Sequence, residues 1–299
     1  MNTFFSINHS SHKTTGWKAE VILEFKNRFG KSVLGSCSRK GPLTFQRPFY
    51  PEKEVCHLYL LHPPGGIVGG DSIDLDINIK KDAHALITTP GATKFYRSQG
   101  LTAYQLQHFD VASTGVLEWF PQETILFPGA KAEISTRVDL DGNAVFLGWE
   151  ILCLGRPASQ MDFDTGSLKS RFCVYKKGIP LFIDQLNIDN DMDSKAMRHC
   201  NPGLQGFAVS AVFVVAGIPP DMFFDKASEI KFDTATVSDK GKIDTATALK
   251  GITRINNVLV ARYLGHDPEE AKTYFISIWN VVRQVMLNRA ACIPRIWAT

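Results

Sequence analysis

The chain has 299 residues, of which 44% are hydrophobic and 21% are charged, a balance that is normal for a globular protein with a sizeable core. The formal net charge is only +3 and the basic residues are scattered, which excludes the electrostatic footprint of a nucleic-acid-binding protein. The first residues lack a signal-peptide pattern and the longest apolar run, residues 207–218, is too short to span a bilayer, so we predict a cytoplasmic protein without membrane contact.

Apolar and polar residues alternate with a period of two through most of the chain, which predicts β-strands. In residues 72–79, for example, Ile73 and Leu75 fall on one face and Asp74 on the other. Residues 55–61 are apolar without alternation, which indicates a strand buried on both faces. The predicted strands are residues 21–25, 31–37, 43–47, 55–61, 72–79, 83–89, 102–111, 115–120, 132–140, 144–153, 167–175, 180–188 and 207–216.

Turn residues separate these strands. The pair Asp141-Gly142 lies between two alternating runs, which predicts a hairpin that joins residues 132–140 to 144–153. The polar, acidic stretch 187–202 is expected to form a long loop. The sequence has no repeat of fixed period.

Helical patterning appears only late in the chain. Residues 219–229 are expected to form a short helix, and residues 267–287 a long one that is capped by Asp267, with Pro268 in its first turn. Because no linker separates domains, we predict a single domain over residues 1–299. Its β-rich part covers residues 1–216, and its mixed α/β part covers residues 217–299.

Cysteine and histidine spacings give no sign of a closed metal site. The six cysteines include no CxxC pair, and three of them fall in apolar strands where a buried, reduced thiol is expected. His57 and His62 are five residues apart, so an unbroken strand would place them on opposite faces. Residues 189–200 begin like a calcium loop but have serine at the sixth position and cysteine at the twelfth, so that pattern fails.

The most distinctive segment is residues 62–71, HPPGGIVGGD, with four glycines between two predicted strands. A P-loop needs Lys-Ser/Thr after its last glycine and then a helix, and a dinucleotide-binding loop needs GxGxxG at the start of a helix. Here Asp71 and a strand follow the last glycine, so both nucleotide-binding interpretations fail. We predict a tight crossing between strands, with His62 and Asp71 at its two ends.

Acidic side chains occur next to aromatic residues and within apolar strands. Glu118 and Glu123 bracket two aromatic residues, and Glu150 interrupts an otherwise apolar run. Such a carboxylate needs a buried partner or forms part of the wall of a polar channel. Together with Asp71 and Asp184, these residues are dispersed oxygen donors, which hold borderline divalent metals such as Ni²⁺ loosely. They suit the transit of a cation better than its storage.

Four motifs together resemble the blocks of the urease accessory protein UreD family, called UreH in some systems. They are HPPGGIVGGD at residues 62–71, TTPGATKFYRS at 88–98, EWFPQET at 118–124 and EILCLGRP at 150–157, in the family's order. Further similarity at residues 47–56 and 262–265 extends the resemblance over nearly the whole chain. The motifs are long and peculiar to the family, which makes the resemblance specific.

The resemblance implies a mainly β fold: a stacked, helix-like arrangement of β-sheets with a few α-helices toward the C-terminus. It implies a non-enzymatic scaffold and metallochaperone component that joins UreF and the GTPase UreG, docks on the urease apoprotein and helps to deliver nickel. It implies no tightly bound cofactor, only nickel in transit through an internal tunnel. We therefore expect Asp71, Glu150 and Asp184, with His62 at one mouth, to act as transient nickel ligands.

Other interpretations stay open at this stage. The chain is alternatively a structural adaptor without metal contact, whose carboxylates form salt bridges, or a hydrolase that uses paired acids such as Glu118 and Glu123. Residues 267–299 are predicted to contribute to the UreF contact, because Ile293, Ile296 and Trp297 beyond the helix offer apolar anchors. Packing of this segment on its own sheet is the competing expectation.

Overall fold

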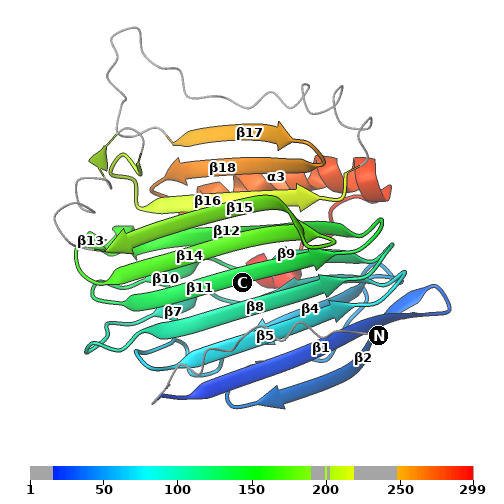
Figure 1. Cartoon of the computed structure of the whole chain (residues 1–299), viewed down its shortest axis with the longest axis horizontal. Coiled ribbons are helices and arrows are strands. Elements are labelled where there is room, and N and C mark those ends of the chain that lie inside the picture. The colour runs from blue at the N-terminus through cyan, green and yellow to red at the C-terminus, as the bar shows by residue number, and fades with distance from the viewer. Residues whose placement is uncertain (1–15, 190–198, 201–202, 219–247, 299) are drawn as a thin grey trace, which may run out of the picture.

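The computed structural model describes residues 16–189, 199–200, 203–218 and 248–298, which form a β-solenoid of about four turns. Two sheets face each other, and the chain passes from one to the other on each turn (Figure 1). The expected mainly β, stacked architecture is confirmed. The described residues contain no helix that is long and apolar enough to cross a membrane.

The first sheet, sheet I, has seven strands, and its central strands β1, β5, β8, β11 and β14 run parallel. Its edge strands β2 and β15 pair antiparallel with their neighbours. The order across the sheet is β15 (Ile179–Asp189), β14 (Ser167–Lys176), β11 (Lys131–Leu140), β8 (Ala103–Val111), β5 (Ser72–Ile79), β1 (Lys18–Arg28) and β2 (Lys31–Lys40).

The second sheet, sheet II, is parallel from β4 through β6 and β9 to β12, and antiparallel from β12 onward. Its order is β17 (Leu249–Ile255), β18 (Val258–Gly265), β16 (Val209–Ala216), β12 (Val145–Arg156), β9 (Val116–Phe120), β6 (His84–Thr88), β4 (Cys56–Leu61) and β3 (Thr44–Phe45). Short elements complete the coils: β7 (Thr93–Phe95), β10 (Thr124–Leu126), η1 (Pro157–Ser159) and β13 (Met161–Asp162).

The same kind of four-residue turn carries the chain from sheet I to sheet II on successive coils. The backbone N–H of Ala83 donates to the carbonyl of Lys80 (3.1 Å), Gly115 to Ala112 (2.8 Å), and Ala144 to the carbonyl three residues before it (2.9 Å). The prediction that Asp141-Gly142 forms a hairpin is therefore wrong. β11 pairs with β8 and β14, and β12 pairs with β9 and β16, so the two strands beside this turn belong to different sheets.

The coils differ in length, which explains why the sequence shows no fixed repeat. Ser72, Tyr104, Glu133 and Lys169 are register partners on successive strands of sheet I, and they are separated by 32, 29 and 36 residues. The loops that follow sheet II differ from coil to coil and absorb these differences. Stacking of backbone hydrogen bonds, rather than sequence periodicity, keeps the coils in register.

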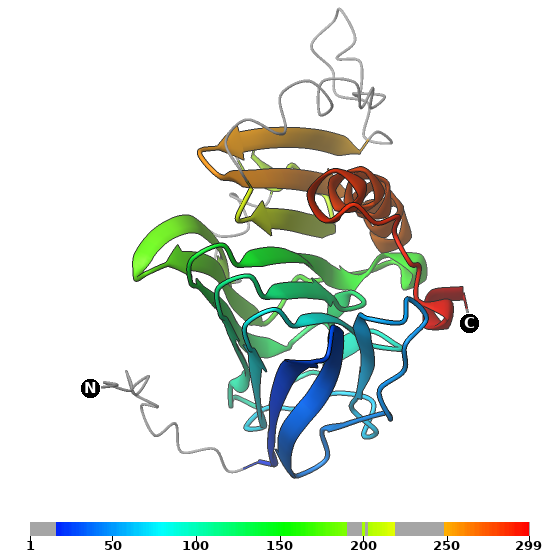
Figure 2. The same cartoon turned by 90° about the vertical axis from the view of Figure 1, so that its right-hand side faces the viewer.

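The helix α3 (Pro268–Leu287) covers the outer face of sheet II, and the turn η2 (Arg295–Ala298) follows it (Figure 2). The predicted cap is confirmed, because the Asp267 carboxylate accepts a hydrogen bond from the Glu269 backbone (2.8 Å). α3 is the one long α-helix of the described residues, and the short helix expected at residues 219–229 lies outside them.

Apolar side chains form two clusters, one between the sheets and one between sheet II and α3. Successive side chains along a strand of sheet II point to opposite faces, so they pack alternately in one cluster and in the other. In β12, for example, Leu147 and Trp149 point toward α3, whereas Phe146 and Leu152 point into the solenoid. Sheet II therefore has two buried faces, and polar residues on either face need a partner or a cavity.

Candidate functional site

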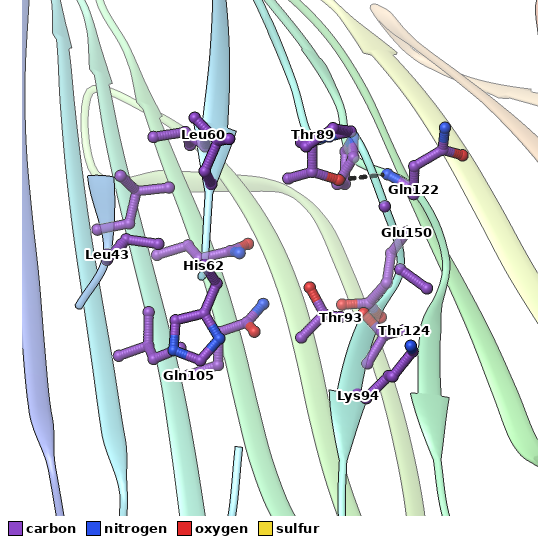
Figure 3. A pocket seen from close by; sticks show the side chains of 18 of the residues that line it. Leu43, Leu60, His62, Thr89, Thr93, Lys94, Gln105, Gln122, Thr124 and Glu150 are labelled. Carbon is purple, nitrogen blue, oxygen red and sulfur yellow. Dashed lines mark hydrogen bonds between the residues drawn. The ribbon is translucent and has the colours of Figure 1, made fainter. Parts of the chain in front are cut away.

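A cavity of about 330 Å³ lies between the two sheets, inside the solenoid. Two loops that the sequence singled out, 61–66 and 89–94, contribute to its wall (Figure 3). Its apolar lining includes Leu43, Leu60, Ile73, Leu75, Trp119 and Phe172, and its polar lining includes His62, Lys94, Gln105, Gln107, Thr136 and Glu150. An apolar chamber with a few convergent polar groups is the usual form of a binding site.

Glu150 lies on β12 and points into the solenoid, as its alternation with Trp149 predicts. Within the described residues it has one hydrogen-bond partner, the Ser170 hydroxyl of sheet I, which donates to its Oε2 (2.8 Å). Burial raises the pKa of the Glu150 carboxyl to about 7, and the charge of Asp184 acts in the same direction. Within the part of the chain that the structure describes, no arginine or lysine forms an ion pair with Glu150.

Asp184 lies beyond Glu150, on β15 at the edge of sheet I. Both residues line a second, small cavity of about 20 Å³, together with Ser170 and Arg262. That volume suits about one water molecule. At its outer side Arg262 donates from Nη2 to Asp184 Oδ1 (2.8 Å), and the two side chains are 54% and 29% exposed. Glu150 thus belongs to both cavities, and Asp184 leads from the inner one toward solvent.

His62 lies at the opposite side of the main cavity, directly after β4 (Figure 3). Burial lowers the pKa of the His62 imidazole, and the negative charge of Asp71 only partly opposes this. The ring is therefore neutral near neutral pH and offers a nitrogen lone pair. His57 points to the other side of sheet II, so the predicted opposition of the two histidines is confirmed.

Asp71 is not among the described residues that line either of these cavities. Its Oδ1 accepts a hydrogen bond from the Trp17 backbone (2.8 Å) and its Oδ2 one from the Val68 backbone (3.0 Å). These two bonds fasten the start of β1 to the glycine-rich loop. Of the four residues proposed as nickel ligands, His62 and Glu150 line one cavity and Glu150 and Asp184 line the other, whereas Asp71 lies in a loop contact.

The glycine-rich loop is the predicted tight crossing, from β4 in sheet II to β5 in sheet I. A Cβ at Gly66 would lie 2.1 Å from the Tyr96 ring, and one at Gly69 would lie 2.3 Å from the Ser98 hydroxyl. Gly70 has a φ of 95°, a conformation that side chains other than glycine rarely adopt. Close packing explains these glycines, and the crossing holds His62 at the cavity.

Glu118 has a different environment from Glu150, although it lies on the neighbouring strand β9. It is fully buried on the face of sheet II that α3 covers, where Trp279 Nε1 (2.6 Å) and Arg283 Nε (3.1 Å) donate to it. Burial raises the pKa of the Glu118 carboxyl, but the hydrogen bond from His84 (2.6 Å) and the adjacent charges outweigh burial and lower it. A carboxylate enclosed in this way cannot reach a substrate, which contradicts the hydrolase interpretation.

The network that surrounds Glu118 was not predicted from the sequence. Arg283 is fully buried, and it also holds Glu52 through Nη1 (2.6 Å) and Nη2 (2.7 Å). His57 contacts the same Glu52 carboxylate (2.7 Å). One local signal was present, because Arg283 falls on the apolar stripe of α3, next to Val282.

A second charged group lies on the outer face of sheet I. His108 contacts Asp139 (3.1 Å) and Asp76 (3.5 Å) on the flanking strands. Hydrogen bonds to these two carboxylates raise the pKa of His108 to about 9. Because its side chain is 27% exposed and already has these partners, we interpret this group as a stabilising ladder across three strands.

A family model and several known proteins match this chain over nearly its whole length. A family model described as UreD urease accessory protein matches residues 18–298. The urease accessory protein UreD of Alcanivorax borkumensis is 42% identical over 288 residues, which cover 95% of this chain and 93% of that protein. The UreD proteins of Citrobacter koseri and Escherichia coli are 40% and 37% identical, with 97% of this chain covered in each case and 95% and 100% of those proteins.

Proposed function

The chain belongs to the UreD urease accessory protein family, and from this premise we propose that it passes nickel through its interior during urease maturation. The family is one of non-catalytic accessory proteins that act in urease maturation. In our proposal His62, Glu150 and Asp184 are successive, transient nickel ligands. No tightly bound cofactor takes part.

The observation that carries this proposal is the position of Glu150 between two cavities. His62 and Glu150 share the main cavity, and Glu150 and Asp184 share the small one. Imidazole and carboxylate groups are ligands for borderline divalent metals, and each of them alone binds weakly. A series of single ligands within apolar walls lets a cation move from one to the next without being trapped.

The chemistry of Glu150 suits a transit ligand. A buried carboxylate is costly to ionise unless a cation accompanies it, and the raised pKa of Glu150, about 7, expresses that cost. Arrival of a divalent cation supplies the missing positive charge and displaces the proton. When the cation leaves, the carboxyl takes up a proton again, so the site does not hold its cargo.

The partners in this proposal are UreF, UreG and the urease apoprotein. The predicted UreF contact in residues 267–299 has one exposed apolar anchor, Ile293, which is 48% exposed. Trp297 instead packs on its own chain, against Trp149 (5.5 Å between ring centroids), and donates a hydrogen bond to Thr88 (2.9 Å). We keep Ile293 as the proposed contact and assign Trp297 to the fold.

The test is nickel delivery by a variant in which both interior carboxylates are neutralised. Glu150→Gln with Asp184→Asn, expressed with the other accessory proteins and urease, is expected to lower the nickel content of urease while the complex still assembles. The matched control is Glu133→Gln, the same substitution on the outer face of β11. Normal nickel content in the double variant would refute the passage.

A structural adaptor without metal contact is the second candidate. The observation that favours it is the ion pair between Asp184 and Arg262, which gives that carboxylate a structural partner. On this account the double variant assembles less complex, and the nickel content per assembled complex is normal. Measurement of both quantities in the same preparation separates the two functions.

A further inference from the structure

Three side chains that suit metal coordination meet where the C-terminal tail crosses the start of β4. They are Glu52, just before β4; His57, on β4; and Cys292, between α3 and η2. One potential ligand atom from each lies within 4.8 Å of the other two. His57 is fully buried, and the other two side chains are partly accessible. The cluster joins segments more than 230 residues apart, so no sequence spacing reveals it.

The two ring nitrogens of His57 have different surroundings. Its Nε2 lies 2.7 Å from Glu52 Oε2, whereas its Nδ1 is buried and has no hydrogen-bond partner among the described residues. A buried polar atom without a partner costs about 1–3 kcal/mol. Glu52 and His57 can share one ion through Oε2 and Nε2, the two atoms that lie 2.7 Å apart, with the ion in place of the proton between them.

The charges around the cluster also leave room for a cation. Glu52 and Glu118 are both buried to a large extent, and they share a single guanidinium, that of Arg283. A divalent cation bound together with a thiolate adds one net positive charge beside these two carboxylates.

Burial, followed by the negative charge of Glu52, raises the pKa of the Cys292 thiol. The thiol is therefore protonated when no metal is present. Coordination replaces this proton: the sulfur–metal bond forms, and the proton leaves to solvent or buffer without any change of oxidation state. The affinity of such a site falls as the pH is lowered.

We propose that Glu52, His57 and Cys292 bind a borderline divalent cation of the Zn²⁺ or Ni²⁺ class. Thiolate and imidazole select such ions over Mg²⁺ and Ca²⁺, which take oxygen ligands. The site lies on the α3 side of sheet II, whereas His62 and Glu150 lie inside the solenoid. It goes beyond the nickel passage, because its ion ties the C-terminal tail to β4 and is retained.

The test uses the purified full-length chain, freed of metal, under reducing conditions and titrated with Co²⁺ as a spectroscopic probe. We expect a thiolate-to-cobalt charge-transfer band in the near ultraviolet that saturates at one equivalent. Cys292→Ser is expected to abolish this band and to weaken binding by roughly tenfold or more. Cys37→Ser, at an exposed cysteine outside the cluster, is the matched control and is expected to keep the band.

Thermal unfolding provides a second readout that is independent of colour. Zn²⁺ is expected to raise the unfolding temperature of the wild-type chain and of Cys37→Ser, but not that of Cys292→Ser, because an ion that binds only the folded state stabilises it. Without metal, the wild-type chain and Cys292→Ser should unfold alike. A charge-transfer band that persists in Cys292→Ser, or the absence of a band in the wild type, overturns the proposal. Glu150→Gln should bind Co²⁺ normally, so failure of the passage and failure of this site are distinguishable.

Discussion

Glu118 and Glu150 lie on adjacent parallel strands of the same sheet, and their charges have opposite surroundings. Glu118 faces α3 and is enclosed by Arg283, Trp279 and His84, and its pKa is lowered. Glu150 faces the interior, where a single hydroxyl donates to it, and its pKa is raised to about 7. A buried carboxylate with a complete set of partners supports the fold, and one without them is available to a cation.

The largest effect is expected from removal of the charge on the α3 side. Glu118→Gln leaves the Arg283 guanidinium with one carboxylate instead of two in a fully buried site, and loss of one partner from a buried ion pair costs about 3–5 kcal/mol. Chemical denaturation of the full chain measures this loss. Glu133→Gln, on the outer face of sheet I, should change the stability by less than about 0.5 kcal/mol. Equal stability of the two variants would show that the network is not structural.

The interior carboxylate should behave in the opposite way. The pKa of Glu150 rises from 4.5 to about 7 on folding, so the folded state holds the proton more tightly than the unfolded state. The stability it contributes is complete below pH 4.5 and is lost as the pH rises through 7. At roughly 1.4 kcal/mol per pKa unit, the pKa rise of about 2.5 corresponds to a loss of up to about 3.5 kcal/mol. Glu150→Gln should abolish this part of the pH dependence and be more stable than the wild type above pH 7. If the stability of the wild type and that of Glu150→Gln changed in parallel with pH, the conclusion that Glu150 lacks a neutralising partner among the described residues would be contradicted.

Substitution of Asp71 tests whether this residue has a structural role, as Glu118 has, or lies on the nickel route, as we propose for Glu150. Asp71→Asn keeps one acceptor for its two backbone donors, so we expect a loss of about 1–2 kcal/mol and faster amide hydrogen exchange at Trp17 and Val68. Normal nickel delivery per assembled complex should accompany this change. Unchanged exchange with impaired delivery would move Asp71 into the nickel route.

The smallest effect is expected on the exposed face of sheet I. His108 has a pKa raised from 6.5 to about 9 by Asp139 and Asp76, so its stabilisation is complete below pH 6.5 and disappears as the pH rises through 9. Because the group is partly exposed, solvent screening limits it to about 1 kcal/mol or less. His108→Gln should be less stable than the wild type at pH 6.5 and equal to it above pH 9. A difference that persists above pH 9 would mean that packing, and not charge, is responsible.

Local patterns in the sequence predicted most of the long strands and the helix α3, but they missed β17 and β18 and did not predict how the strands pair. Alternation located β5 and β11, and capping by Asp267 located the start of α3. The pair Asp141-Gly142 predicts a hairpin, but it forms a corner between the two sheets, and a local pattern cannot distinguish these two kinds of turn. β17 was missed because Gly251 and Arg254 interrupt its apolar alternation, and its pairing with β18 is what makes it a strand.

In the candidate site, too, local sequence patterns predicted some features and only the fold revealed the others. Glu150 stood out because it interrupts an apolar strand, and its neighbours in sequence fixed the side to which it points. The partners of Glu118 could not be found in this way, since Glu52 and Arg283 are 231 residues apart. Asp71 looked equivalent to Glu150 in sequence, and only the fold shows that two backbone N–H groups already occupy it.

The most direct measurement compares Glu118→Gln and Glu150→Gln in one experiment, with nickel bound by urease divided by the amount of accessory complex assembled. We predict that Glu150→Gln lowers nickel per assembled complex without loss of thermal stability. Glu118→Gln should lower stability and the yield of complex, with normal nickel per complex. Normal nickel per complex in Glu150→Gln, or a selective nickel defect in Glu118→Gln, would contradict the assignment of the two carboxylates.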